Sequence, residues 1–303
     1  MLNRHTHGKI VWIDLESPTQ DEVRSLIEEF SIDAFVAEEL LFPSVKPRCE
    51  SHDRYIYVIL HFPALRHSHK GREQEVDFVI GRDFIITSRY DTIDPLHKFA
   101  KVFEVNSVLD KSNIGDHAGF VFYYMLRKMY KSVEHELSYV HDALMGIERQ
   151  IFKGVEREMV MSLSHSGHDL LLLRQAIEPH RDVLHSLEFE MARFFGDEFR
   201  PYLRGLSNGY FRVHNHIMRH TETLHELRET NNSLLTTKQN EVMKTFTILA
   251  FVTLPLSLIA TLFGMNTVYT PLTQRPDGFW IILLGMGVAA LLMYLYFRNK
   301  KWL

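Results

Sequence analysis

FTILAFVTLPLSLIATLFGMNTVYTPLTQRPDGFWIILLGMGVAALLMYLYF, residues 246–297, decides the fold of this chain, and RNKKWL follows at 298–303. The stretch contains two uncharged apolar runs, 246–263 and 279–297. A helix needs about 20 residues to cross the hydrocarbon core of a bilayer, at about 1.5 Å per residue. The sequence therefore predicts two transmembrane helices joined by a short outer loop.

Basic residues border both runs at the ends away from that loop: Lys238 and Lys244 before the first run, and Arg298, Lys300 and Lys301 after the second. Such residues stay on the cytoplasmic side of a membrane. The sequence thus predicts a multi-pass protein of the cell inner (plasma) membrane with both termini cytoplasmic.

The composition limits what the rest of the chain can bind. Of the formal net charge of −4 over 303 residues, the part after Gly264 carries +3, which leaves −7 for residues 1–264. A mildly acidic body of this kind argues against nucleic acid as a partner. Cys49 is the single cysteine, which excludes an intrachain disulfide and a cysteine zinc site.

The first hundred residues have a mixed α/β pattern. β-branched and aromatic residues predict strands at 10–15, 55–62, 75–80 and 84–87. Thr19 and Glu22 are spaced as a capping box that opens a helix ending at Phe30. The connections between the last three strands are short, so we expect those strands to pair antiparallel.

Helical spacing of apolar residues begins near residue 117. It predicts one helix over 117–151, a second from about Glu156 to His185, and a third over 210–263 that only Pro255 interrupts. Between the last two, helix breakers gather at Gly196, Pro201, Gly205 and Gly209. A helix as long as 210–263 needs partners, so we expect it to pack against identical subunits.

One stripe of the first membrane helix is polar or small. Positions at alternating steps of three and four are Asn240, Met243, Thr247, Ala250, Leu254, Ser257, Thr261 and Gly264. Such a seam faces a bundle axis, where it either lines a pore with apolar rings at Met243 and Leu254 or forms a dry helix–helix interface. No carboxylate lies between Lys244 and Asp277. A cation on this path would keep most of its water, which suits Mg2+ because it releases water reluctantly.

A Gly264-Met265-Asn266 tripeptide stands at the outer end of that helix, and Asn299-Lys300-Lys301-Trp302-Leu303 closes the chain. Together with further motifs, these features resemble the CorA family of divalent-cation channels along nearly the whole sequence. The further motifs are Trp12-Ile13-Asp14-Leu15, Ser17-Pro18-Thr19, Glu38-Glu39-Leu40-Leu41, Lys46-Pro47-Arg48, Ile85-Ile86-Thr87, Asn240-Glu241-Val242-Met243-Lys244 and Pro255-Leu256.

The resemblance implies a funnel-shaped homopentamer with an α/β cytosolic domain, a long helical stalk and two C-terminal transmembrane helices. Gly264, Met265 and Asn266 would be its selectivity motif, and Asn240, Met243, Phe246, Leu254 and Ser257 match pore positions of the family. The implied parts are a cytosolic α/β domain (1–112), a helical region (113–209), a stalk (210–245), a pore-lining helix (246–263), an outer loop (264–278), a second transmembrane helix (279–297) and a basic tail (298–303).

The sequence departs from the family pattern in three places. The outer loop has no acid before Asp277, which weakens capture of cations. Asp94 resembles one partner of the regulatory carboxylate pair that binds Mg2+ between subunits, but Val213 stands where the second is expected. The stalk between Glu229 and Asn240 is shorter than expected by about one heptad, which would keep the seam in register.

His216 and His220, four apart on the stalk, form a separate metal candidate. They share one helix face and could bind a transition metal with a carboxylate such as Glu222 of a neighbouring subunit. The alternative is that they are exposed or titrating interface residues.

These observations favour a channel that passes Mg2+, with Co2+ and Ni2+ as further cargo. A zinc transporter of the same fold, coupled to protons, is the second hypothesis, and a non-conducting membrane-anchored scaffold is the third. The sequence predicts no enzyme and no cofactor, because it has neither a phosphate-binding Gly-x-x-x-x-Gly-Lys loop nor a His-Glu-x-x-His pair. The expected partners are four identical subunits, membrane lipids and the transported cation.

Overall fold

The computed structural model describes residues 1–44, 46–63, 74–90, 93–109, 115–265 and 276–300. It divides into a first unit, Met1–Arg228, and a second unit, Glu229–Leu303. One helix, α7 (Arg200–Gly264), contributes residues to both units. Each unit is described by itself.

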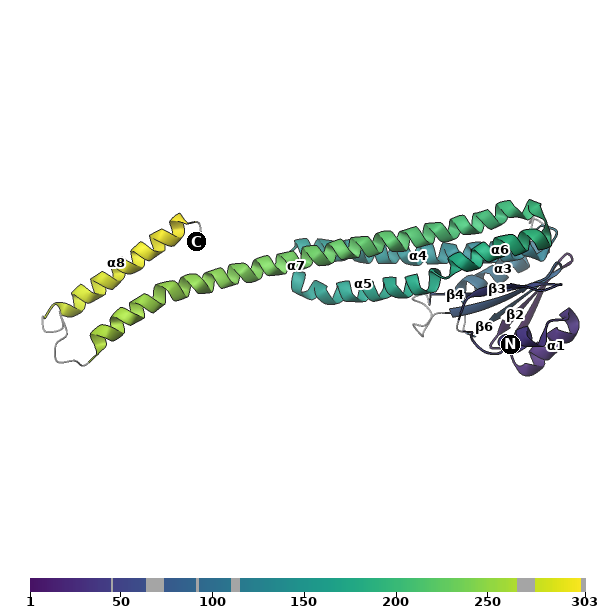
Figure 1. The fold of residues 1–303 in the computed structure, drawn as a ribbon, viewed down its shortest axis with the longest axis horizontal. Helices are drawn as coiled ribbons and strands as arrows, with labels where there is room; N and C mark the ends of the chain where they lie inside the picture. The colour runs from purple at the N-terminus through teal and green to yellow at the C-terminus, as the bar shows by residue number, and fades with distance from the viewer. Residues whose placement is uncertain (45, 64–73, 91–92, 110–114, 266–275, 301–303) are drawn as a thin grey trace. The chain divides into compact units, whose positions relative to one another are not determined.

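A six-stranded mixed sheet forms the base of the first unit (Figure 1). Its strands are β1 (Leu2–His7), β2 (Ile10–Glu16), β3 (Arg48–Ser51), β4 (Ile56–Phe62), β5 (Gln74–Ile80) and β6 (Phe84–Arg89), in the order β1-β2-β6-β5-β4-β3. The four predicted strands are confirmed, as is the antiparallel pairing of β4, β5 and β6. The sequence did not predict β1 or β3, nor the parallel pairing of β2 with β6.

Two short helices, α1 (Gln20–Phe30) and α2 (Ala34–Glu39), cover one face of the sheet. The predicted capping box is confirmed: the Thr19 amide donates to Glu22 Oε2 at 2.9 Å, and the Glu22 amide donates to Thr19 Oγ1 at 3.4 Å. Both bonds satisfy amides that the first helical turn leaves without partners. Val23 and Leu26 then bury their side chains in a cluster with strand residues such as Ile86.

Longer helices cover the opposite face: α3 (Asp94–Leu109), α4 (Ala118–Phe152) and α6 (His180–Phe195). Their contacts with the sheet are largely aromatic. The ring of Trp12 lies 5.5 Å from that of Phe103 in α3, and Phe78 lies 5.1 Å from Phe122 in α4, both edge to face. Edge-to-face pairs add to the stabilisation from area burial. The sheet is therefore a middle layer between two layers of helices.

The predicted second helix, Glu156 to His185, is wrong as a single element. The structure has α5 (Glu156–Ile177) and α6, separated at Glu178 and Pro179. Proline lacks the amide that a continuous helix would need. A break at this point lets α6 return to the sheet while α5 pairs with α4.

The predicted breakers at 201, 205 and 209 do not break a helix. After a short 3-10 turn at Asp197–Phe199, α7 starts at Arg200, so Pro201 falls in the first turn, where its missing amide costs nothing. A Cβ at Gly205 would lie 3.4 Å from the Tyr123 ring, and one at Gly209 would lie 3.5 Å from the Tyr130 ring. Both distances are ordinary van der Waals contacts, so the two glycines continue the helix against tyrosines of α4.

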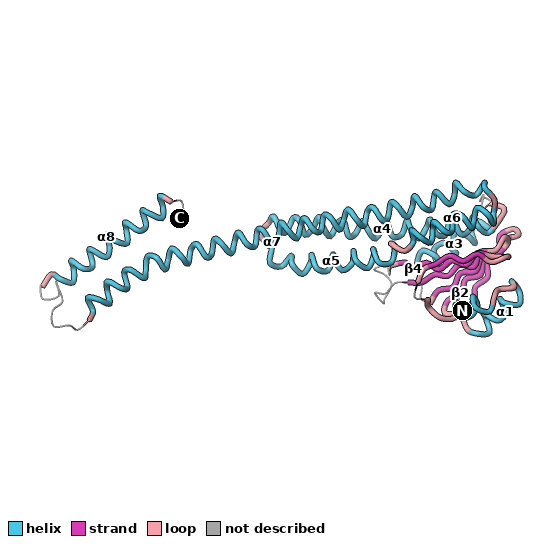
Figure 2. Tube along the Cα trace, in the orientation of Figure 1, coloured by secondary structure: helices cyan, strands magenta, loops and turns pink. Residues whose placement is uncertain are grey.

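The first part of α7 runs parallel to α4 (Figure 2). Tyr123 contacts Tyr202, Glu134 accepts a hydrogen bond from Arg212 at 2.9 Å, and His141 contacts His220. The separation in sequence between partners stays almost constant along the pair, which requires two helices that run in the same direction. Aligned charges, aromatic rings and buried apolar residues such as Val213 and Ile217 hold the register.

The second unit contains the remainder of α7 and α8 (Gly278–Asn299). Both are long and apolar enough to cross a membrane. Pro255 lies inside α7, as the sequence predicts. The finer boundaries at 112, 209 and 245 stay predictions.

Candidate ion pathway

The membrane part of α7 and most of α8 expose apolar side chains over much of their circumference. Exposed fractions reach 62% for Phe246, 68% for Leu254, 67% for Trp280 and 71% for Leu284. In a water-soluble protein, apolar patches of this extent are covered by a partner or a membrane. A helix that is apolar on all sides is typical of a bilayer span.

One face of α7 differs, because its side chains are half-buried within the single chain. Along the second unit this face carries Ile248, Val252, Leu256, Ile259 and Phe263. A matching face of α8 holds Ile282, Met286, Ala289, Met293 and the buried Phe297. Phe251 and Phe297 meet edge to face at 6.2 Å between ring centres, so α7 and α8 pack against each other here.

The predicted stripe lies on the other side of α7. At about 100° per residue, its mean direction is roughly 170° from that of the half-buried face. All eight of its members are exposed in the single chain: Asn240, Met243, Thr247, Ala250, Leu254, Ser257, Thr261 and Gly264. Phe246 is exposed as well but stands to the side of the stripe. The packing of α8 therefore leaves the stripe free to face other copies of α7.

Two hydroxyl groups of the stripe have a defined orientation. Thr247 donates to the carbonyl of Met243 at 2.8 Å, and Thr261 donates to the carbonyl of Ser257 at 2.7 Å. A hydroxyl has one proton and two acceptor lone pairs. Because each proton is used within the helix, these oxygens present only acceptors to whatever lies beside the stripe.

Gly264 ends α7, and Met265, 53% exposed, follows it. Asn266, the third member of the predicted selectivity motif, lies outside the described residues. A Cβ on Gly264 would meet no described atom within 4 Å. Packing within the described part of the chain therefore does not explain the glycine.

Known proteins were compared with this chain. A sequence model of the family described as "CorA-like Mg2+ transporter protein" matches residues 7–300. The chain belongs to this CorA-like family.

Individual relatives agree with that membership. The "Cobalt/magnesium transport protein CorA" of Thermotoga maritima is 26% identical and aligns over 96% of this chain and 83% of its own. The CorA structure from Methanocaldococcus jannaschii superposes with a TM-score of 0.85 at 21% identity, covering 97% of this chain and 92% of that one. A full-length CmaX structure gives 0.76 at 20% identity, covering 97% and 89%. These similarities confirm the predicted CorA-like fold.

The regulatory carboxylate predicted in this CorA-like chain is placed only in part. Asp94 begins α3, and its side chain lies outside what the structure describes. Val213, at the position expected for its partner, is fully buried. The regulatory role of Asp94 stays a prediction, and Val213 occupies the position expected for its carboxylate partner.

The stalk histidines gain a neighbour that sequence reasoning missed. The rings of His216 and His220 are 6.2 Å apart, and His141 from α4 lies 5.6 Å from His220. Burial, and after it the charges of His141, His216 and Arg219, lower the pKa of His220. No sequence signal links position 141 to 220, because only the register of α4 against α7 brings them together.

Two buried polar groups also escaped the sequence analysis. Asp77 is fully buried in β5; the Tyr57 hydroxyl donates to its Oδ2 at 3.4 Å, and its Oδ1 has no partner among the described atoms. Burial, followed by the charge of Glu75, raises the pKa of Asp77. His180 is fully buried between the Tyr130 hydroxyl at 2.9 Å and the His61 carbonyl at 2.7 Å.

Bonding and burial together indicate the protonation state of His180. Nε2 faces a carbonyl and must donate. Burial lowers the pKa of His180 to about 4, so near pH 7 the ring is neutral and Nδ1 accepts from the Tyr130 hydroxyl. These contacts join α4, α6 and β4 in the core, away from the stripe.

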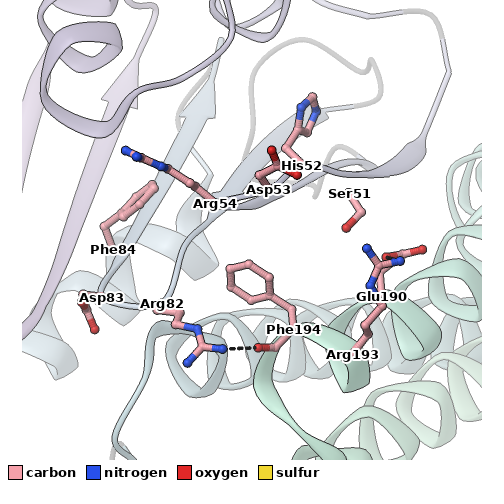
Figure 3. Close-up of a pocket in the computed structure, with 10 residues that line it drawn as sticks. All are labelled: Ser51, His52, Asp53, Arg54, Arg82, Asp83, Phe84, Glu190, Arg193 and Phe194. Atoms are coloured by element: carbon pink, nitrogen blue, oxygen red, sulfur yellow. Dashed lines mark hydrogen bonds and ion pairs between the residues drawn. The ribbon is translucent and has the colours of Figure 1, made fainter.

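A cleft of about 480 Å3 opens between the sheet and α6 (Figure 3). Arg82 spans it and donates to the carbonyl of Phe194 at 3.2 Å. Its charged lining is balanced, with three arginines against three carboxylates: Arg54, Arg82 and Arg193, and Asp53, Asp83 and Glu190. The cleft therefore offers no excess charge that would attract an ion.

Proposed function

We propose that this chain forms a divalent-cation channel of the cell inner (plasma) membrane, with Mg2+ as its principal cargo and Co2+ and Ni2+ as further ions. The observation that carries the proposal is the division of α7 into two faces. One face packs against α8, and the opposite one presents the stripe of small and hydroxyl-bearing residues. The CorA names of the relatives supply the class of ion.

In the proposed homopentamer, five copies of α7 surround a common axis with their stripes inward and α8 outside. Both termini are cytoplasmic, as the basic residues at each end of the hairpin favour. Gly264, Met265 and Asn266 form the outer mouth, where five Asn266 side chains accept hydrogen bonds from the water shell of the ion. Met243 and Leu254 form apolar constrictions, which gate by excluding water.

The acceptor oxygens of Thr247 and Thr261 suit an ion that keeps its water. Water molecules bound to a cation point their hydrogens outward, and the two back-bonded hydroxyls accept from them. The stripe has no carboxylate that would replace the water shell. Mg2+ loses water reluctantly, so recognition through its water shell is the favoured chemistry.

Transport needs no chemical energy source in this proposal. A unit charge gains about 2.3 kcal/mol per 100 mV, and a divalent cation twice that, about 4.6 kcal/mol. An inside-negative membrane therefore drives entry. Function as a channel requires no catalytic residue in the chain.

A zinc transporter of the same fold, coupled to protons, is the second candidate. It is favoured by the outer loop, which has no acid before Asp277. A scaffold that does not conduct is the third, and it would leave the exposed hydroxyls of the stripe without a role.

Ion flux into proteoliposomes tests the proposal. Mg2+ uptake is compared with Zn2+ uptake, with and without a pH gradient, for wild type and Asn266→Ala; Asn232→Ala, exposed on α7 well before the membrane segment, is the matched control. We expect passive Mg2+ flux that Asn266→Ala lowers and the control leaves unchanged. Mg2+ flux independent of Asn266 contradicts the pore assignment, and a stable assembly of other than five chains by mass contradicts the architecture.

A further inference from the structure

The three histidines His141, His216 and His220 form a cluster on the first unit that the proposed ion pathway does not use. His216 and His220 are one turn apart on α7, and His141 comes from the neighbouring α4. Ring centres are 5.6 Å apart for His141 and His220 and 6.2 Å for His216 and His220. His141 is exposed and the other two are half-buried, so the cluster is open to solvent.

These separations are close to those that a shared metal ion imposes. With Zn–N bonds of about 2.0–2.1 Å and tetrahedral geometry, the ring centres of two imidazole ligands lie about 5 Å apart. The observed distances of 5.6 Å and 6.2 Å exceed this by roughly 0.6 Å and 1.2 Å. Among the described residues, no three His, Cys, Asp or Glu side chains already surround one point. Small side-chain rotations must therefore complete the site when metal arrives.

The backbone positions of the cluster are fixed by the packing of α4 on α7. Val140 and Leu144 beside His141 are buried, as is Ile217 between His216 and His220. Two turns earlier, the Glu134–Arg212 ion pair holds the same register. The packing of α4 on α7 therefore places the three imidazole rings together at the edge of this interface.

We propose that His141, His216 and His220 bind a divalent transition metal ion, of the class of Zn2+, Ni2+ or Co2+, and so fasten α4 to α7. Imidazole suits these ions, whereas Mg2+ prefers oxygen ligands. A water molecule completes the coordination shell. His141 replaces the carboxylate of a neighbouring subunit that the sequence suggested, so the site is complete within one chain and does not depend on the proposed transport activity.

Nearby charges modulate the site. Arg219 lies between His216 and His220 on α7 and opposes a cation, while Asp142 beside His141 on α4 favours one; both are exposed. Imidazole ligands favour transition metals. A site that ignores Mg2+ would respond to transition metals in the cytosol while Mg2+ passes the pore.

The test measures metal binding to the full-length protein in detergent, after chelator treatment and size-exclusion chromatography. Equilibrium dialysis against ZnCl2, with excess MgCl2 present, gives affinity and stoichiometry, and the visible absorption of bound Co2+ reports the geometry. The variants are His141→Ala, His216→Ala and His220→Ala. His225→Ala, exposed on another side of α7, is the matched control.

We expect one Zn2+ per chain, at least about tenfold weaker binding in each cluster variant, and no change in the control. His141→Asp, which keeps a metal ligand, should retain binding that His141→Ala loses. Comparing His141→Asp with His141→Ala distinguishes loss of a metal ligand from a general disturbance of folding. Wild-type affinity in His141→Ala, or displacement of Zn2+ by Mg2+, overturns the proposal. Mg2+ flux, measured in buffer free of transition metals, should be unchanged in all variants, which separates this site from the pore.

Discussion

Single cysteines on two faces of α7 would distinguish a water-filled pathway from a helix surrounded by lipid and protein. Ser257 and Thr261 belong to the exposed stripe, whereas Leu256 and Ile259 belong to the face that packs toward α8. Ser257 and Leu256 differ in depth by only about 1.5 Å, and Thr261 and Ile259 by about 3 Å, because a helix rises about 1.5 Å per residue. Any difference in labelling therefore reports the face and not the distance from the membrane surface.

The native thiol contributes almost no background. Cys49 is the single cysteine, and burial, aided by the charges of Glu190 and Glu50, raises its pKa to about 12. At about pH 7.5, a thiol with an ordinary pKa of about 8.5 is roughly 9% thiolate, while Cys49 is almost wholly protonated. Since the thiolate is the reactive form, Cys49 should react far more slowly.

The assay applies a charged, membrane-impermeant thiol reagent to the outside of proteoliposomes and follows labelling by mass spectrometry. Ser257→Cys and Thr261→Cys should label at least about tenfold faster than Leu256→Cys and Ile259→Cys, because the thiolate forms only where water reaches. Wild type measures the background. Equal rates on the two faces, or faster labelling at 256 and 259, would refute the pore-facing assignment of the stripe.

Three further predictions concern single substitutions. Gly264→Ala should leave the fold of the single chain intact, because a Cβ there meets no described atom within 4 Å, yet lower Mg2+ flux in proteoliposomes. Asp77 has a raised pKa, so the folded protein keeps a proton that the unfolded chain releases; thermal stability should fall as pH rises from about 4, and Asp77→Asn should flatten that slope. The pKa of His180 is lowered to about 4, so only the unfolded chain takes up the proton as pH falls from about 6.5 to 4, and the protein should lose up to about 3 kcal/mol of stability. His180→Gln should remove that loss. Unfolding followed by circular dichroism at several pH values measures it.

The membrane hairpin could be predicted from the sequence because its surroundings are uniform. In hydrocarbon, a helix must satisfy its own backbone and expose apolar side chains, so composition over 246–263 and 279–297 suffices. The stripe follows from the helical period once one end of the helix is known. The half-buried face toward α8 could not be told apart by composition, because Leu249 and Leu262 are equally apolar and are exposed.

The wrong predictions in the first unit concern prolines and glycines, because these residues occur both in loops and inside helices. Pro201, Gly205 and Gly209 look like a loop, yet the proline fits a first turn and the glycines continue the helix against Tyr123 and Tyr130. Nothing in the sequence around Gly205 and Gly209 indicates that tyrosines of α4 lie beside them. Conversely, Pro179 does separate two helices, within a stretch whose apolar spacing looks continuous.

Non-local contacts account for the rest. The parallel pairing of β2 with β6 joins strands about 70 residues apart, with α1, α2 and three strands between them. His141 meets His220 for a similar reason, through the register of two long helices. A periodic pattern shows which face of an element is buried but does not name the residue on the other side.

Selection among divalent ions is the step at which the pathway and the histidine cluster complement each other. The described stripe offers hydroxyl and amide oxygens, carbonyls and methionine, but neither imidazole nor carboxylate. Oxygens that act through the water shell respond mainly to charge and hydrated size, so they discriminate poorly between Mg2+ and Zn2+. Imidazoles at His141, His216 and His220 make the opposite selection, since they bind Zn2+ and ignore Mg2+. In the proposed channel, the stripe would admit divalent ions with little discrimination, and a transition metal bound in the first unit would change the contact of α4 with α7 while Mg2+ would not.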